Sequence, residues 1–393
     1  MKDFQFYAPT EVVFGEQSEE QVAHLVKHYG GHKVLVHYGG QSAVKSGLLD
    51  KICGLLHEGG IELVQLGGVV PNPRLSTVRE GIALCRQEGI DFILAVGGGS
   101  VIDSAKAIAY GVPYEGDVWD FYLGKAQAEV CLPVACVLTI PAAGSEMSEA
   151  SVITNEDGDV KLGYSNNISR PKFAIMNPRR TFTLPPYQTA AGVTDILMHT
   201  MERYFNPDCD MTLTDEIAEA LMRNVKESVF AALKNPEDYR SRAQIMWAGS
   251  LAHNDVTGSR TNGDWATHQI EHELSGLFDV THGAGLAAVW GSWARYVYKE
   301  NVSRFARFAV NVMGVPNDFA DPEGTALKGI EAMERFYHAI GMPVNIRELI
   351  GREVTDEEIK EMARKCTRNC TITQGKFKVL RVEDIEEIYR MAN

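Results

Sequence analysis

The sequence predicts an N-terminal α/β domain built on a parallel sheet, followed by an all-helical domain. Before about residue 185, short apolar runs rich in β-branched residues alternate with helix-like stretches, which is typical of strands joined by helical crossovers. After Leu184–Pro186, apolar residues recur at helical spacing in one segment after another. A chain of 393 residues also exceeds what one core comfortably fills. We therefore expect two domains, 1–185 and 186–393.

Five apolar runs are the predicted strands of the first domain: Lys33–His37, Ile61–Leu66, Asp91–Val96, Val134–Thr139 and Phe173–Met176. The helix-like stretches beside them favour a parallel sheet covered on both faces. Two further runs, Ser151–Thr154 and Val160–Tyr164, flank the charged turn Glu156–Asp159 and predict a β-hairpin inserted in this pattern. Alternating apolar residues in Phe4–Phe14 predict an extended segment that pairs with its copy in a second subunit, and hence a homodimer.

Helical periodicity defines the second domain, with predicted helices at Thr189–Phe205, Thr214–Leu233, Arg242–Thr257, Thr267–Leu277 and Ala284–Lys299. Two prolines, Pro185 and Pro186, favour entry into the first of these helices. The more charged tail, residues 352–393, is predicted to be helical, with an irregular loop around Thr371–Lys378.

Composition narrows the class of partner. Hydrophobic residues make up 45% of the chain and charged residues 23%, an ordinary balance for a globular protein. The formal net charge of −14 argues against nucleic acid or an anionic membrane, because both would repel it. No apolar run approaches the ~20 residues that span a bilayer, and the N-terminus carries no apolar signal segment. With seven scattered cysteines, we expect a cytoplasmic protein with free thiols.

Two pairs of residues four apart are the most informative motif, Asp195/His199 and His268/His272. Four residues are about one helical turn, so both members of a pair can face one pocket. His282 follows, in a predicted turn between two helices. Carboxylate and imidazole groups suit a divalent metal. We therefore predict a metal site of one carboxylate and three imidazoles, from Asp195, His199, His268 and His282.

The predicted ligands also suggest a chemistry. A divalent ion with one carboxylate leaves the site at about +1, which favours a carbonyl oxygen or an alkoxide if one coordination position stays open. Without a thiolate ligand, Fe2+ and Zn2+ both fit. The alternative is structural: buried histidines are often simply hydrogen-bonded in a core, and buried Asp–His pairs also occur without a metal.

Three glycine-rich or small-residue turns follow predicted strands of the first domain. In Ile93–Lys106, a strand is followed by three glycines and a helix start, which can bind a phosphate through backbone N–H groups. This turn matches neither the usual dinucleotide fingerprint nor a Walker A loop. Thr139–Glu146 and Tyr38–Ser42 are the other two turns. Together they predict a nucleotide at the carboxyl edge of the sheet, although such a turn can also be purely structural.

The turn after the first strong strand bears on the choice of coenzyme. An enzyme that binds NAD often places a carboxylate there for the adenosine ribose. Gly39, Gly40, Gln41 and Ser42 offer none. A 2′-phosphate would meet no repulsion, so NADP is favoured, with NAD possible.

These motifs, in this order, resemble the iron-containing (group III) alcohol dehydrogenase family, and in particular its butanol dehydrogenase-like branch with NADPH-dependent aldehyde reductases. The resemblance runs over nearly the whole chain. The matching segments are Tyr7–Gly15, Val69–Pro73, Gly97–Asp103, Thr139–Glu146, Ala190–Asp195, Asp264–His268 and Thr281–Gly283.

The resemblance implies a dehydroquinate synthase-like fold, with a nucleotide-binding α/β domain, a helical metal domain and a cleft between them. It implies that Asp195, His199, His268 and His282 bind the metal, and that His272 lies near the substrate without being a ligand. For the coenzyme it implies a larger set, namely Gly98, Gly99, Ser100 and Asp103 at the pyrophosphate, with Thr139, Ser145 and Lys161 beside it. Gly39 stands where NAD-preferring relatives often carry Asp.

The expected function is reversible hydride transfer between NAD(P)H and a short- or medium-chain aldehyde or primary alcohol. The metal would act as a Lewis acid on the oxygen, and His272 is the candidate for proton delivery. Two alternatives remain at this point: a metal- and NAD-dependent cyclase or lyase of the dehydroquinate synthase type, and a non-enzymatic metal- or nucleotide-binding protein. The segment Thr257–Asp264 has its own polar sequence, so the resemblance does not fix the substrate.

Overall fold

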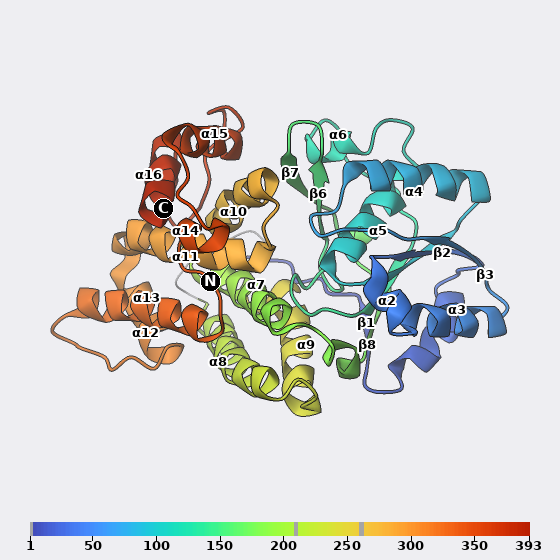
Figure 1. Cartoon of the computed structure of the whole chain (residues 1–393), viewed down its shortest axis with the longest axis horizontal. Helices are drawn as coiled ribbons and strands as arrows, with labels where there is room; N and C mark the ends of the chain where they lie inside the picture. The colour runs from blue at the N-terminus through green and yellow to red at the C-terminus, as the bar shows by residue number, and fades with distance from the viewer. Residues whose placement is uncertain (1–2, 208–210, 259–262) are drawn as a thin grey trace. The chain divides into compact units, whose positions relative to one another are not determined.

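The computed structural model describes residues 3–207, 211–258 and 263–393, which divide into two compact units (Figure 1). One unit is Ala8–Thr183. The other runs from Leu184 to Asn393 and includes residues 3–7. Within the described residues, no helix is both long and apolar enough to cross a membrane.

A six-stranded parallel sheet forms the centre of the first unit, in the order β1-β8-β5-β4-β2-β3. Its strands are β1 (Glu11–Phe14), β2 (Lys33–Tyr38), β3 (Glu62–Leu66), β4 (Phe92–Gly97), β5 (Val134–Leu138) and β8 (Phe173–Met176). The predicted parallel sheet is confirmed, with bounds that shift by a residue or so. Only the last four residues of the predicted segment Phe4–Phe14 form a strand, β1, which pairs in parallel with β8 at the edge of the sheet.

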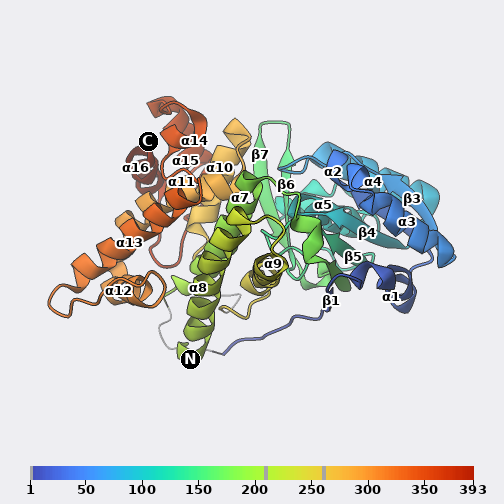
Figure 2. The ribbon, with the colours of Figure 1, turned by 60° about the horizontal axis from the view of Figure 1, so that its bottom comes forward.

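Helices cover both faces of this sheet. They are α1 (Val22–His28), α2 (Gln41–Lys45), α3 (Leu48–Glu58), α4 (Leu75–Glu88), α5 (Gly99–Gly111) and the short α6 (Trp119–Tyr122). Alternate strand residues such as Val34, Val36 and Leu94 share a core with α1, α2 and α3. α5 packs on β4, with α4 beside it (Figure 2). Because both faces are covered, the strands are nearly continuously apolar.

The strand order creates a switch point in the sheet. From β2 the chain moves outward to β3, and then returns to place β4 on the other side of β2. In open α/β sheets, ligands bind where the strand order reverses, at the carboxyl ends of the strands. Here those ends are Tyr38 and Gly97, at the start of two of the predicted coenzyme turns.

The predicted hairpin is also present, as antiparallel β6 (Ala150–Asn155) and β7 (Val160–Ser165). Among the described residues, short 3-10 helices lie at Ser18–Gln21, Asn167–Ser169 and Pro178–Thr181 in this unit and at Tyr298–Asn301 in the helical unit.

The second unit is helical, as predicted. Its helices are α7 (Pro186–Tyr204), α8 (Thr212–Lys234), α9 (Tyr239–His253), α10 (Ala266–Phe278), α11 (His282–Val297), α12 (Val302–Asn311), α13 (Pro322–Ala339), α14 (Ile346–Ile350), α15 (Asp356–Cys366) and α16 (Val382–Ala392). Two predictions were wrong in detail. The helix predicted to reach Thr257 ends at His253, and His282 is the first residue of α11 rather than part of a turn.

α7 and α11 lie at the centre of this unit. Every residue of α7 from Thr189 to Tyr204 is buried, because α8, α9 and α11 pack around it. A helix that is surrounded in this way can carry polar residues only if they have partners inside the protein. The crossing of α7 and α11 is tight: a Cβ atom on Gly283 would lie 2.0 Å from the carbonyl oxygen of Ala191.

Candidate metal centre and coenzyme loops

Asp195 and His199 lie one turn apart on the buried helix α7, as their spacing predicts. Nδ1 of His199 is 2.9 Å from the backbone carbonyl oxygen of Asp195 and 2.9 Å from its Oδ1. The imidazole therefore keeps Nε2 as the nitrogen that could bind a further group. Burial and charge neighbours set both pKa values. Burial would raise the pKa of Asp195, but His199 and the other histidines hold that pKa well below its usual range. Burial lowers the pKa of His199.

Two more histidines come from other helices to the same carboxylate. Nε2 of His268, on α10, is 3.7 Å from Oδ1 of Asp195, and Nε2 of His282, at the start of α11, is 3.8 Å from it. The candidate ligand atoms of these three residues lie within 4.8 Å of one another. Ligand bonds of about 2 Å to one divalent ion place ligand atoms at such separations. His199 is not in this compact group, although its ring centroid is 4.5 Å from that of His268.

The chemistry of these atoms fits a cation. Oδ1 of Asp195 and Nε2 of His268 are both buried, and among the described residues neither makes a hydrogen bond, although Oδ1 lies in ion-pair contact with His199. Buried polar atoms without partners cost about 1–3 kcal/mol each, so two that face one point are a strong indication of a missing ligand. An ion bound there would satisfy both atoms.

His272 lies beside this group. Its ring centroid is 5.7 Å from that of His282 and 6.5 Å from that of His268. It forms a second possible cation group with Glu271 and His282, so the two groups share one histidine. His272 is buried and lies beside the first group without belonging to it.

An aromatic side chain borders the histidines. The ring centroid of Trp265 is 6.0 Å from that of His199 and 5.4 Å from that of His268. Trp265 adopts a left-handed backbone conformation, with φ 64°, directly before α10. The guanidinium of Arg203 lies 4.7 Å from its ring centroid, which holds the indole in place.

Sequence reasoning missed two buried carboxylates, Glu202 and Glu271. Oε1 of Glu202 is 3.1 Å from Nδ1 of His268, and Oε2 of Glu271 hydrogen bonds Nδ1 of His282. A signal was present in the spacing, because Glu202 is seven residues after Asp195 and Glu271 three after His268. Both offsets return to the ligand face of a helix.

The predicted phosphate turn lies between β4 and α5. A Cβ atom on Gly98 would lie 3.1 Å from Cβ of Ile140, and one on Gly99 would lie 3.0 Å from Cβ of Ala143. The glycines are therefore needed because the turn after β5 packs directly on them. Ser100 follows in the first turn of α5, a 13-residue helix whose N-terminal N–H groups can bind an anion.

The other two turns adjoin this one. The backbone N–H of Thr139 donates to the carbonyl of Gly97 at 3.0 Å. A Cβ atom on Gly39 would be 3.5 Å from Cγ2 of Val101, an ordinary contact. The rest of that turn is exposed, in Gly40, Gln41 and Ser42. The structure thus brings all three predicted turns together at the switch point of the sheet.

Asp103 and Ser145 hold the loop that follows β5. The hydroxyl of Ser145 donates to Oδ1 of Asp103 at 2.5 Å, and the backbone N–H of Val152 donates to Oδ2 at 2.9 Å. Burial raises the pKa of Asp103, against the opposing charges of Lys106 and Lys161. Lys161 is itself buried in β7.

Lys106 was not predicted to matter, yet it organises this loop. The ammonium lies 2.7 Å from the carbonyl of Ser145 and 2.9 Å from the carbonyls of Ser148 and Ala150. The side chain is fully buried in α5. The sequence shows a lysine among the apolar residues of α5, but this pattern does not reveal which loop the lysine contacts.

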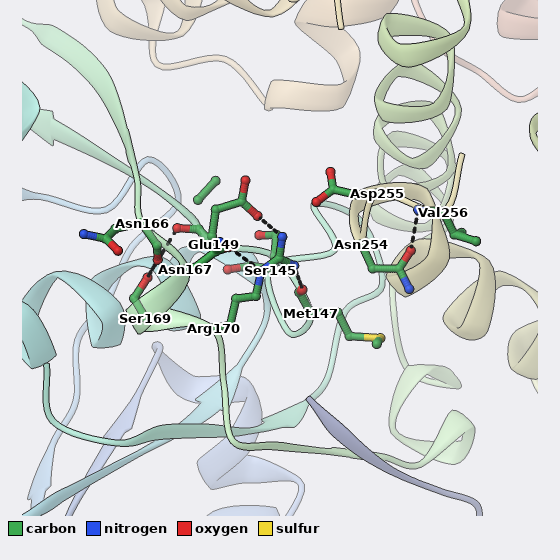
Figure 3. A network of polar contacts seen from close by, with 12 residues as sticks. Ser145, Met147, Glu149, Asn166, Asn167, Ser169, Arg170, Asn254, Asp255 and Val256 are labelled. Atoms are coloured by element: carbon green, nitrogen blue, oxygen red, sulfur yellow. Dashed lines mark hydrogen bonds and ion pairs between the residues drawn. The ribbon is translucent and has the colours of Figure 1, made fainter. Parts of the chain in front are cut away.

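A second buried cation, Arg170, also contacts this loop (Figure 3). Arg170 contacts Oε2 of Glu149 at 2.6 Å and donates to the carbonyl of Met147 at 2.5 Å. Both charged side chains are almost completely buried. These contacts restrain the loop 145–149, because breaking a buried ion pair would leave a buried charge without its partner.

Comparisons with known proteins agree with this arrangement. A profile of the iron-containing alcohol dehydrogenases matches residues 9–178, and a profile of the C-terminal region of the Fe-containing alcohol dehydrogenase family matches residues 189–393. The chain belongs to the iron-containing alcohol dehydrogenase family. The expected family and fold class are confirmed.

Three known proteins are similar to this chain in sequence or structure over most of its length. The NADH-dependent butanol dehydrogenase A of Clostridium acetobutylicum is 38% identical over 99% of both chains. The NADPH-dependent aldehyde reductase YqhD of Escherichia coli is 32% identical over 88% of this chain and 89% of its own length. The crystal structure of NADH-dependent butanol dehydrogenase A from Thermotoga maritima superposes with a TM-score of 0.95 at 39% identity, covering 100% of this chain and 99% of that one. A cyclase or lyase of the dehydroquinate synthase type is not favoured by these relatives.

Proposed function

We propose that this chain is a metal-dependent oxidoreductase that transfers a hydride reversibly between NAD(P)H and a short- or medium-chain aldehyde or primary alcohol. Its relatives include butanol dehydrogenases and an aldehyde reductase. The observation that carries the proposal is the convergence of Asp195, His268 and His282. Two of their buried atoms, Oδ1 of Asp195 and Nε2 of His268, make no hydrogen bond within the described residues.

The residues of the helical unit would have two roles, metal binding and proton transfer. The metal would be held by Asp195, His199, His268 and His282. When bound, the cation supplies Lewis acidity toward the substrate oxygen, and the nicotinamide supplies the hydride. A divalent ion with the single carboxylate of these four ligands would carry a charge of about +1 within the ligand set, which favours an oxygen that gains negative charge. Glu202 and Glu271 lie outside this set, at Nδ1 of His268 and His282. His272, outside the ligand group, is placed to hold or move a proton as an imidazole.

The residues of the α/β unit would hold the coenzyme. Gly98, Gly99 and Ser100 offer backbone N–H groups at the start of α5 for the pyrophosphate. Thr139 and Ser145 lie on the adjoining turn. Asp103 belongs to the same pyrophosphate loop and accepts a hydrogen bond from Ser145. Lys161, buried in β7, is proposed to contact the coenzyme.

The finer proposal is that NADP is preferred to NAD. Gly39, Gly40, Gln41 and Ser42 place no carboxylate near the end of β2, so a 2′-phosphate would meet no repulsion. The contact made by a Cβ atom on Gly39 is ordinary, and its φ is not positive, so the backbone does not demand glycine there. The butanol dehydrogenases above are named as NADH-dependent, and both coenzymes therefore belong in the assay.

Iron is the proposed metal, with Zn2+ as the alternative, because the family is named for iron and the donor set suits either ion. Elemental analysis of the purified protein decides between them. A homodimer is also proposed: β1 lies at the edge of the sheet, and the neighbouring Phe4 and Phe6 are each 51% exposed. Light scattering on the intact protein tests the proposed dimer.

The proposed location is the cytoplasm. The buried free thiols of Cys85 and Cys136 suit that reducing compartment.

The central experiment follows the nicotinamide absorbance of NADPH and NADH with a series of linear aldehydes. We expect aldehyde-dependent oxidation that requires a bound divalent metal. The variant His268→Ala should lose metal and turnover while it still binds coenzyme. Full activity of this variant in metal-free buffer would refute the proposed ligand set, and tight binding without any aldehyde-dependent oxidation would refute the enzyme.

A further inference from the structure

Two buried glutamates bind the far side of two proposed metal ligands. Oε1 of Glu202 accepts a hydrogen bond from the backbone N–H of His268 at 3.0 Å and lies 3.1 Å from its Nδ1. Oε2 of Glu271 hydrogen bonds Nδ1 of His282. The glutamate side chains are 1% and 0% exposed. In both histidines the opposite nitrogen, Nε2, is the one near Asp195.

The position of Glu271 is itself specified by its surroundings. The hydroxyl of Ser275, one turn further along α10, donates to Oε1 of Glu271. On the neighbouring helix α11, Gly285 leaves room for the carboxylate, because a Cβ atom there would lie 2.7 Å from Oε1. Two helices therefore shape a pocket for this one side chain, next to the histidine that it contacts.

A neutral imidazole has one nitrogen that donates and one that accepts. A carboxylate at Nδ1 keeps the proton on that nitrogen and leaves the lone pair of Nε2 for a metal. His199 follows the same rule without a glutamate, because its Nδ1 lies against the backbone carbonyl of Asp195. All three imidazoles are thus contacted at Nδ1, and in His268 and His282 Nε2 is the nitrogen that faces Asp195.

We propose that Glu202 and Glu271 are positioning residues of the metal centre, which fix the orientation and tautomer of His268 and His282 so that Nε2 binds the cation. The inference rests on the proposed metal-dependent function and deepens it. Neither glutamate belongs to the ligand group formed by Asp195, His268 and His282. Their effect is therefore on metal affinity and geometry, which can be measured without turnover.

The test uses the intact protein stripped of metal and titrated with Co2+ alone, with visible absorption and competition by a chelator as the readouts. Glu202→Gln and Glu271→Gln should each weaken Co2+ binding about 10–100-fold and alter the visible spectrum. Zn2+ serves as a second probe, through the chelator competition. Ser275→Ala, which removes the donor to Glu271 and a longer contact to the carbonyl of Val280, should give a smaller loss of affinity than Glu271→Gln.

The matched control is Glu219→Gln. Glu219 is a buried carboxylate of α8 that bonds Tyr204 and Arg307 and contacts no proposed ligand. It should change stability and leave Co2+ affinity as in the unaltered protein. Circular dichroism checks that each variant is folded.

Unchanged Co2+ affinity and spectrum in the folded glutamate variants would overturn the inference, as would an equal loss in Glu219→Gln. If Glu271→Gln does not fold, unchanged affinity in Ser275→Ala overturns the role of Glu271. These results leave the proposed function intact. Failure of the unaltered protein to bind Co2+ or Zn2+ would instead refute the metal centre itself.

Discussion

The substitution Lys106→Met should destabilise the α/β unit through its loop at 145–150. The ammonium of Lys106 lies within 2.9 Å of the carbonyls of Ser145, Ser148 and Ala150. Methionine has a similar volume, so the change removes the donors without opening a cavity. Three buried carbonyls that lose a donor, at about 1–2 kcal/mol each, give an expected loss of about 3–6 kcal/mol.

Urea denaturation followed by circular dichroism measures this loss, with Lys27→Met as the control. Lys27 is exposed on α1, and its replacement should change the free energy of unfolding by no more than about 0.5 kcal/mol. Because the loop after β5 also carries proposed coenzyme residues, Lys106→Met should weaken NADPH binding too, which fluorescence titration measures. A loss below about 1 kcal/mol with normal NADPH binding would refute the reasoning, since the carbonyls would then have other donors.

Three more predictions concern single residues. Burial lowers the pKa of His37 to about 4, against about 6.5 in the unfolded chain. The protein is therefore more stable by up to about 3 kcal/mol above pH 6.5, and this stability is lost as the pH falls toward 4. His37→Gln should flatten that part of the curve of unfolding free energy against pH, and an unchanged curve would contradict the assignment. Gly39→Asp should fold normally and move the ratio of kcat/KM values from NADPH toward NADH, because a carboxylate there repels a 2′-phosphate and accepts from a ribose hydroxyl; an unaltered ratio would remove Gly39 from the coenzyme site. Gly283→Ala should lower the thermal transition temperature of the helical unit and weaken metal binding, because the added Cβ would lie 2.0 Å from the carbonyl of Ala191. The control Gly54→Ala, in the middle of α3 with nothing within 4 Å of its Cβ, should stabilise the protein by about 0.5–1 kcal/mol. The opposite order in calorimetry would show that the helix crossing can relax.

The sequence alone predicted the parallel sheet, the hairpin and the helical domain, because each depends on a local periodicity. It also placed Asp195 and His199 on one helix face, since a spacing of four residues is enough to do so. The end of α9 was less predictable. The apolar pattern runs on to Thr257, but the helix stops at His253, and the chain soon adopts a left-handed conformation at Asp255.

Local patterns by themselves determined which residues are proposed for a metal or a phosphate: an acid and histidines at helical spacing, and glycines after a strand. Only the tertiary structure decided which groups support them. Glu202 meets His268 because the chain that enters α10 is hydrogen-bonded to α7 at Glu202, and Lys106 meets the carbonyl of Ser145 across 39 positions of the chain. The physical reason is that a periodic pattern fixes a side chain's direction on its own element, whereas its partner depends on how separate elements pack.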